Sequence, residues 1–321
     1  MVPPLITLEE HYVSSKVRKH LGDKDPYSHF PEAMISKLSS LSSTRISDMD
    51  AGSVRLQILS HGPLDATAAL CTEANDELAA ATSAHSSRLA GFAMLPMGEP
   101  EAAAKELRRC VREHKFVGAL INNHLNGTFY DDQKFWPVFA AAEELDVPVY
   151  IHPTFASEFD LNFSGNFSAK AAFAMSSAAW SWHSETGLHV LRLWASGLFD
   201  KYPKLKIVIG HMGEMLPFQL DRIAVQTKGW DDNVKRDLMT VWRENFWITT
   251  SGMFTFPPLR CLVDMIGWEK VMYSVDYPFS TNEQGLNFVK ALEISGLATK
   301  EQLEGFCHGN AEKLFKISAQ D

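Results

Sequence analysis

The sequence predicts an α/β protein of the (β/α)8 TIM-barrel class, and two observations support this prediction. Short, nearly continuous apolar runs recur along the 321 residues, as expected of strands buried on both faces of a parallel sheet. Between them, longer segments carry apolar residues three and four positions apart, together with Ala, Leu and Glu, which favour helices. About eight strand–helix units result, and such units close most naturally into a barrel.

The predicted elements alternate regularly along the chain. Strands are predicted at residues 5–8, 54–59, 89–94, 116–121, 147–151, 206–209, 246–250 and 271–274. Helices are predicted at residues 66–84, 99–114, 134–145, 189–199, 259–266 and 281–292. The sequence has no internal repeat and no linker of biased composition, so we expect a single barrel domain over residues 1–321.

Two connections are longer than the others. Residues 13–47 follow the first strand and residues 153–183 follow the fifth, and both are predicted as long loops of the barrel. Long loops in compact domains commonly form lids or subunit contacts. We expect residues 153–183 to contribute part of a pocket.

A doubly wound sheet is the alternative fold. It would need a glycine-rich phosphate loop after the first strand. The chain continues there with Glu9, Glu10 and His11 instead, and it has no GxGxxG or Walker pattern elsewhere. This difference favours the barrel.

Composition argues against several classes of protein. Acidic residues outnumber basic ones by 39 to 30, for a net charge of −9, and without a basic run a nucleic-acid partner is not expected. The four Cys are widely spaced, which argues against a disulfide scaffold and a Cys-based zinc site. No segment reads as a signal peptide or a membrane helix, so we expect a cytoplasmic protein without a membrane partner.

Side chains that bind metals follow several predicted strands. In a barrel the C-terminal ends of the strands face one common site. Alternate residues of a strand share a face, so Glu9 and His11 are expected to point together and Glu10 away from them. Further candidates follow the fifth, sixth and eighth strands: His152, His211 and Asp276.

These residues predict one divalent metal ion. Nitrogen and oxygen ligands without a thiolate suit a cation of borderline-hard character. Two-metal sites of this architecture usually use a carboxylated Lys at the end of the fourth strand, where Asn122 and Asn123 stand here. We predict Zn²⁺. Mn²⁺ and Mg²⁺ stay open, because these five candidates outnumber the three protein ligands typical of catalytic zinc.

Four motifs carry a resemblance to a known family: LEEHY at 8–12, YIHP at 150–153, IGHMGEMLP at 209–217 and YSVDYPF at 273–279. They resemble the amidohydrolase-related decarboxylases that include aminocarboxymuconate semialdehyde decarboxylase, and in particular the hydroxybenzoate branch. The resemblance implies an amidohydrolase-like barrel that removes CO2 from a small aromatic carboxylic acid with an ortho hydroxyl group, reversibly and without an organic cofactor. It also implies a homodimer or homotetramer.

The resemblance further implies roles for individual residues. His211 is the imidazole near metal and substrate, and Glu214 and Arg222 match a charged pair whose Glu supports that imidazole. Asp276 is the candidate acid for protonation, with His211 as the competing one. The implied metal ligands are Glu9, His11, His152 and Asp276.

Three further residues are candidate substrate contacts. Asn122 is expected either to bind ring hydroxyls or to serve a turn, Phe279 either to wall the pocket or to pack in the core, and His183 to reach the substrate from the long connection. Two other functions stay open: a metal-dependent hydrolase with the same ligands, and a catalytically silent barrel that serves as a scaffold.

Overall fold

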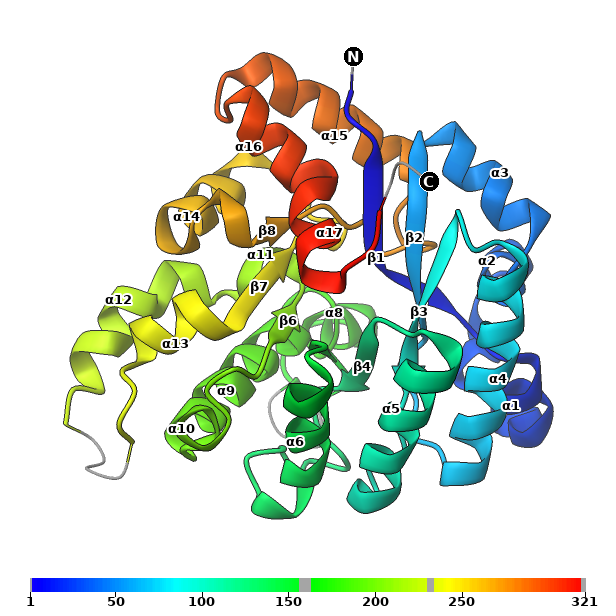
Figure 1. Cartoon of the computed structure of the whole chain (residues 1–321), viewed down its shortest axis with the longest axis horizontal. Helices are drawn as coiled ribbons and strands as arrows, with labels where there is room; N and C mark the ends of the chain where they lie inside the picture. Colours follow the sequence, from blue (N-terminus) through cyan, green and yellow to red (C-terminus); the bar gives the residue numbers. More distant parts are fainter. Residues whose placement is uncertain (1, 156–162, 230–233, 319–321) are drawn as a thin grey trace.

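Eight parallel strands form one sheet in which each strand is hydrogen-bonded to the next in chain order, as predicted for the barrel (Figure 1). The computed structural model describes residues 2–155, 163–229 and 234–318. The strands are β1 Leu5–Tyr12, β2 Val54–His61, β3 Leu89–Met94, β4 Gly118–Asn122, β5 Val149–His152, β6 Ile207–Ile209, β7 Phe246–Thr249 and β8 Val271–Met272.

α-Helices connect the strands, and most of them lie on the outside of the barrel (Figure 1). They are α1 Ser15–Leu21, α2 Glu32–Ser39, α3 Ser43–Ala51, α4 Ala68–Ala84, α5 Pro100–His114, α6 Trp136–Leu145, α8 Ala169–Met175, α9 Ser181–Ala195, α10 Leu198–Lys201, α11 His211–Glu214, α12 Leu216–Gln226, α13 Leu238–Asn245, α14 Phe256–Ile266, α15 Asn282–Ser295, α16 Lys300–Glu304 and α17 Asn310–Phe315. Within the described ranges none of them has the length and apolar character of a membrane span. The cytoplasmic location and the single-domain organisation stay predictions.

The core has two layers because side chains alternate along each strand. In β6, for example, Val208 belongs to a cluster that fills the barrel interior, whereas Ile207 and Ile209 belong to the larger cluster between sheet and helices. Helix α17 completes the interior cluster, with the rings of Phe315 and Phe92 5.6 Å apart between centroids. The polar strand ends therefore sit above a mainly apolar filling.

The barrel closes between β8 and β1 through bonds outside the regular ladder. The backbone N–H of His11 donates to the carbonyl of Tyr277 at 2.7 Å, and the Ser274 hydroxyl donates to the carbonyl of Leu8. These contacts bring the segment after β8 directly against the end of β1.

The two long connections differ from the predicted loops in their internal structure. Residues 13–47 contain α1, α2 and the start of α3, and α1 begins where the Ser14 hydroxyl accepts from the N–H groups of Lys16 and Val17. Residues 153–183 contain α8 and the first turn of α9, which begins eight residues before its predicted start. Helices this short depend on tertiary packing for their stability, so the periodicity of the sequence marks them poorly.

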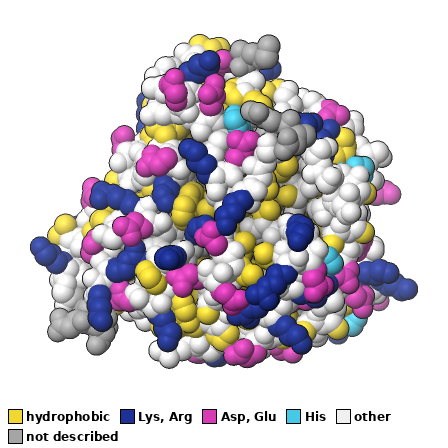
Figure 2. Space-filling model, viewed as in Figure 1, with side chains coloured by type: hydrophobic (Ala, Val, Ile, Leu, Met, Phe, Trp, Pro, Cys, Tyr) yellow, Lys and Arg dark blue, Asp and Glu magenta, His cyan; other side chains and the backbone are white. Residues whose placement is uncertain are grey.

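Charges of both signs are interspersed on the face of the molecule shown in Figure 2. Lys and Arg side chains lie next to Asp and Glu side chains there, and the described residues of this face form no continuous basic surface. This face is therefore not uniformly acidic, although the chain's net charge is −9.

We expect Phe315→Ala to lower the free energy of unfolding by about 3–5 kcal/mol, because it leaves a cavity in the barrel interior. Urea denaturation measures the change. Ile294→Ala is the control, because the Ile294 side chain is 86% exposed and its loss should change stability by less than about 0.5 kcal/mol. Equal effects of the two substitutions would contradict the assignment of α17 to the core.

Candidate metal centre

The end of β1 departs from simple strand alternation. Glu9 has φ +67°, and the pairing with β2 shifts between Leu8 and Glu10, so Glu9 is the extra residue of a β-bulge. With this bulge, Glu9 and His11 both point into the site, and Glu10 points toward β8. These are the directions that the sequence analysis predicted, although it assumed a regular strand without a bulge.

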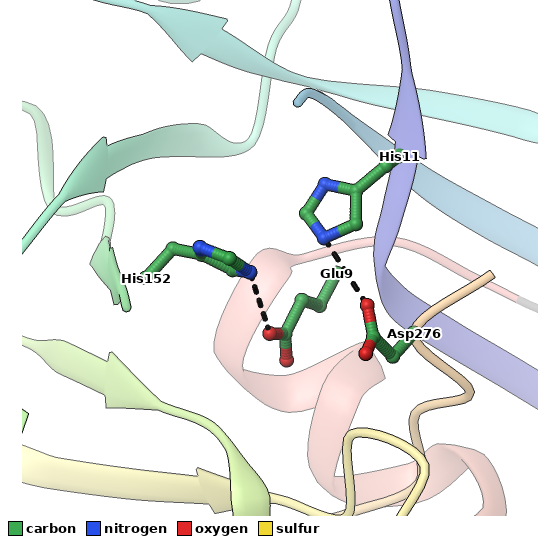
Figure 3. A group of neighbouring side chains, drawn as sticks. All are labelled: Glu9, His11, His152 and Asp276. Carbon is green, nitrogen blue, oxygen red and sulfur yellow. Dashed lines mark ion pairs between the residues drawn. The ribbon is translucent and has the colours of Figure 1, made fainter. Parts of the chain in front are cut away.

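Four side chains from three strand ends converge on one point, as Figure 3 shows. The Nε2 atom of His152 lies 3.3 Å from Oε1 of Glu9, and Nε2 of His11 lies 3.3 Å from Oδ1 of Asp276. One ligand atom from each of the four residues lies within 4.8 Å of the others. The structure thus brings together the four predicted ligands.

The donor set fits a divalent cation. Among the described residues, Oε1 of Glu9, Nε2 of His11 and Oδ1 of Asp276 are buried without a hydrogen-bond partner. A buried polar atom left without a partner costs about 1–3 kcal/mol, so three such atoms facing one another need a ligand. Two carboxylates and two imidazoles are a common nitrogen–oxygen set for divalent metals.

Burial and neighbouring charges shift the pKa values of the ligands in different directions. Burial by itself raises the pKa of Glu9, but the charge of His211 and the hydrogen bond and charge of His152 outweigh it and lower this pKa to about 2. Burial lowers the pKa of His11 to about 4. Burial and then the charge of Glu9 raise the pKa of Asp276 to about 8. Without metal at neutral pH, Glu9 is ionised, His11 is neutral and Asp276 carries a proton.

Neighbouring side chains fix the direction of the ligands. The hydroxyls of Tyr150 and Ser251 both donate to Oε2 of Glu9, which leaves Oε1 for the metal. Nδ1 of His152 donates to the carbonyl of Pro153 at 2.6 Å, so its Nε2 is the free ligand atom. Sequence analysis missed Tyr150, although its place two residues before His152 on the same strand puts both on one face.

Glu10 supports the site from the other side of β1. Its side chain is fully buried, and its two oxygens accept from the backbone N–H groups of Val275 and Tyr277 at 3.0 and 2.9 Å. Asp276 lies between these two residues with φ +62°, a backbone conformation that needs support. Glu10 therefore holds the segment that carries Asp276.

His211 lies beside the four ligands and is oriented by Glu214. Its Nδ1 is 2.8 Å from Oε1 of Glu214, and its Nε2 is 3.9 Å from Oε1 of Glu9. Burial by itself lowers the pKa of His211, but the charges of Glu214 and Glu9 raise it to about 10. His211 is thus a cation that faces the site, with Glu214 in its predicted supporting role.

The structure does not pair Arg222 with Glu214. Arg222 is exposed on α12, a helix that begins only at Leu216, whereas Glu214 is buried. In the part of the chain that the structure describes, no ion pair joins the two, and the second oxygen of Glu214 contacts Nδ1 of His183 at 2.7 Å. His183, predicted as a substrate contact, takes the place expected for Arg222.

Aromatic side chains flank the ligands on two sides. The Phe279 ring lies 5.9 Å from His11, and the Trp182 ring lies 6.3 Å from His152. Phe279 is 43% exposed, so it lines an accessible surface instead of the core. Asn122 at the end of β4 donates to Asp65 at 3.1 Å, and its predicted contact with substrate hydroxyls stays a prediction.

The chain is similar to several proteins named as decarboxylases. A family model described as Amidohydrolase matches residues 15–317. "Decarboxylase orsB" of Emericella nidulans is 44% identical over 99% of this chain and 98% of that protein. Gamma-resorcylate decarboxylase of Polaromonas sp. is 35% identical over 98% of both chains. The crystal structure of a Polaromonas sp. dihydroxybenzoic acid decarboxylase with bound manganese and 2-nitroresorcinol has a TM-score of 0.83 and 32% identity, and covers 98% of this chain and 97% of that one.

Metal binding is expected to release the proton of Asp276. Because a carboxyl ligand must be ionised and the pKa of Asp276 is about 8, metal affinity should rise with pH up to about 8. Calorimetry at pH 7 in buffers of different ionisation heat counts the protons released. The wild type should release about one proton more per metal than Asp276→Asn, and equal release would argue against a protonated Asp276.

Glu10→Gln should weaken metal binding by about 10- to 100-fold, the usual effect of losing a partner that orients a ligand. The Gln side chain keeps one acceptor oxygen, and its NH2 group faces a backbone N–H, so one of the two bonds is lost. Metal titration measures the affinity. Glu113→Gln on the exposed surface is the matched control, and the support role is wrong if both variants bind metal like the wild type.

Proposed function

The chain belongs to the amidohydrolase family and, within it, to the decarboxylases of aromatic acids, and on that premise we propose that it removes CO2 from an ortho-hydroxybenzoic acid to give the phenol. It is a carbon–carbon lyase whose cofactor is a divalent metal ion. The observation that carries the proposal is the convergence of Glu9, His11, His152 and Asp276 beside the cationic His211.

Direct cleavage of an aryl–carboxylate bond would leave an aryl carbanion, so the ring must be protonated first. Protonation at the carbon that bears the carboxylate makes CO2 a leaving group, and its loss restores aromaticity. The reaction therefore needs an electron-rich ring, a positioned acid and a partner for the carboxylate. An ortho hydroxyl that ionises on binding supplies the electrons.

The four ligands would hold the metal ion at the strand ends. When bound, the ion supplies Lewis acidity and a template that fixes carboxylate and phenolate together. Holding the ring against an acid in this way makes proton transfer effectively intramolecular. The site residues then need to move one proton over a short distance.

In this proposal Asp276 transfers the proton and His211 binds the substrate carboxylate. Asp276 takes the proton released by the ortho hydroxyl and delivers it to the ring carbon that bears the carboxylate. The C–C bond then breaks, its electron pair returns to the ring, and the product phenolate takes a proton from water. His211 attracts the substrate carboxylate, which is supported by its raised pKa of about 10 and by the Glu214 hydrogen bond that orients it.

The aromatic side chains suit a flat substrate. Phe279 on the His11 side and Trp182 on the His152 side would pack against the ring faces and exclude water. A dry, apolar setting strengthens the interactions with the charged groups and favours release of neutral CO2. The arrangement supports an aromatic acid better than an aliphatic one.

The proposal also covers the identity of the metal and the oligomeric state. Zn²⁺ stays a prediction, with Mn²⁺ as the direct alternative because the Polaromonas decarboxylase has manganese bound. Elemental analysis of protein purified without added metal distinguishes the two. The homodimer or homotetramer is supported by exposed apolar side chains on α9 and α12, among them Leu188, Phe218 and Val225, and light scattering measures its size.

The enzyme with metal is expected to release CO2 from at least one member of a panel of salicylate, γ-resorcylate, 2,3-dihydroxybenzoate, orsellinate and 6-methylsalicylate. Mass spectrometry follows the loss of CO2. 4-Hydroxybenzoate, which lacks the ortho hydroxyl, should not react. High bicarbonate with the product phenol should yield the acid. Addition of water to a substrate without loss of CO2 would indicate the hydrolase instead.

Asp276→Asn tests the acid within the same assay. Asn tolerates the left-handed backbone at position 276, so the fold should persist. Turnover should fall by at least about 100-fold, the usual contribution of an acid or base, while elemental analysis finds metal retained. Asp264→Asn on the exposed side of α14 is the control, and normal turnover of metal-loaded Asp276→Asn would overturn the assignment.

A further inference from the structure

The segment that carries His211 has an unusual backbone. Five consecutive residues have positive φ angles: His211 at 48°, Met212 at 57°, Gly213 at 91°, Glu214 at 53° and Met215 at 65°. L-residues visit this left-handed region singly and not in runs, because Cβ meets the following carbonyl oxygen. Such a turn persists only when its surroundings hold it.

The carboxylate of Glu214 connects this turn to helix α9. Its Oε1 accepts from Nδ1 of His211 at 2.8 Å, and its Oε2 accepts from Nδ1 of His183 at 2.7 Å. The packing between α9 and the turn is also tight, since a Cβ built at Gly187 would lie 2.8 Å from the carbonyl oxygen of Glu214. Helix α9 thus contacts the turn in two places, at the backbone of Glu214 and at its buried carboxylate.

His183 is held from both sides. Its Nε2 lies 2.8 Å from the carbonyl oxygen of Ala178, and its Nδ1 faces Glu214. Burial alone would raise the pKa of Glu214, but the charge of His211 and hydrogen bonds from His183 and His211 lower it, so this carboxylate is ionised. A carboxylate and a carbonyl can only accept, so both ring nitrogens of His183 face hydrogen-bond acceptors.

We propose that His183 is a positioning residue, which holds the left-handed turn 211–215 through Glu214 so that Nε2 of His211 points into the metal centre. This inference rests on the proposed decarboxylation. Without His183, one oxygen of the buried Glu214 loses its partner, the carboxylate can rotate, and His211 loses its fixed orientation. Because His183 bonds to none of the four metal ligands, metal binding does not depend on it.

Two amide substitutions distinguish the hydrogen bond of His183 to Glu214 from its hydrogen bond to Ala178. The amide nitrogen of His183→Asn falls near the position of Nδ1 and can donate to Glu214. The longer side chain of His183→Gln places its amide near Nε2, toward the carbonyl of Ala178. His183→Leu removes both bonds. His308→Leu is the matched control. Nδ1 of His308 makes a similar hydrogen bond, 2.9 Å long, to Glu312, and this pair lies away from the site.

We expect His183→Leu and His183→Gln to lower kcat by about 10- to 100-fold, as small misplacements of catalytic groups do, and to raise KM as well, because His211 attracts the substrate carboxylate. His183→Asn should recover most of the wild-type kcat, and His308→Leu should match the wild type. Metal content should stay at the wild-type value in all variants. Amide hydrogen exchange of the peptide spanning 209–217, measured in metal-free protein, should be faster in His183→Leu than in His183→Asn.

Wild-type kcat in His183→Leu would overturn the inference. So would a rise in KM alone, which indicates a substrate contact, and a loss of bound metal, which indicates a ligand. Equal exchange rates in the Asn and Leu variants would also overturn it, and this measurement needs no turnover. A wild type that decarboxylates no member of the panel contradicts the proposed function instead.

Discussion

Two neighbouring carboxylates, the buried Glu9 and the half-buried Asp276, set the main constraint on this structure. Like charges this close cannot both stay ionised without a cation, and the pKa of Asp276 is raised first by burial and then by the charge of Glu9. A divalent ion relieves it and satisfies the buried atoms of Glu9, His11 and Asp276 that have no hydrogen-bond partner among the described residues. Much of the polar structure around the strand ends serves to keep these carboxylates together.

Strained backbone gathers at the same strand ends. Glu9, Ser251 and Asp276 all have positive φ, as does the whole turn 211–215. Two of these segments have a polar support from another element: Glu10 binds the backbone on both sides of Asp276, and His183 binds Glu214. These bonds restrict the side chains and fix the directions of the ligands and of the His211 imidazole. A site that moves one proton over a short distance requires such fixed directions.

Net negative charge and an anionic substrate are compatible here for a local reason. The face shown in Figure 2 carries charges of both signs side by side, although the chain's net charge is −9. Within the site, a bound divalent ion dominates the local field. The aromatic rings of Phe279 and Trp182 add flat apolar walls on two sides.

The sequence by itself determined the barrel and the candidate metal site. Apolar runs mark strands directly, and strand ends of a barrel share one face, so Glu9, His11, His152, His211 and Asp276 could be placed together before any coordinates. The family resemblance then separated the four candidate metal ligands from His211. Tertiary structure alone decided the rest, because it depends on contacts between distant segments. It made Glu10 a support, built helices into residues 13–47, and put His183 where Arg222 was expected. The last outcome follows from the left-handed turn, a backbone conformation that packing imposes and that local propensity opposes.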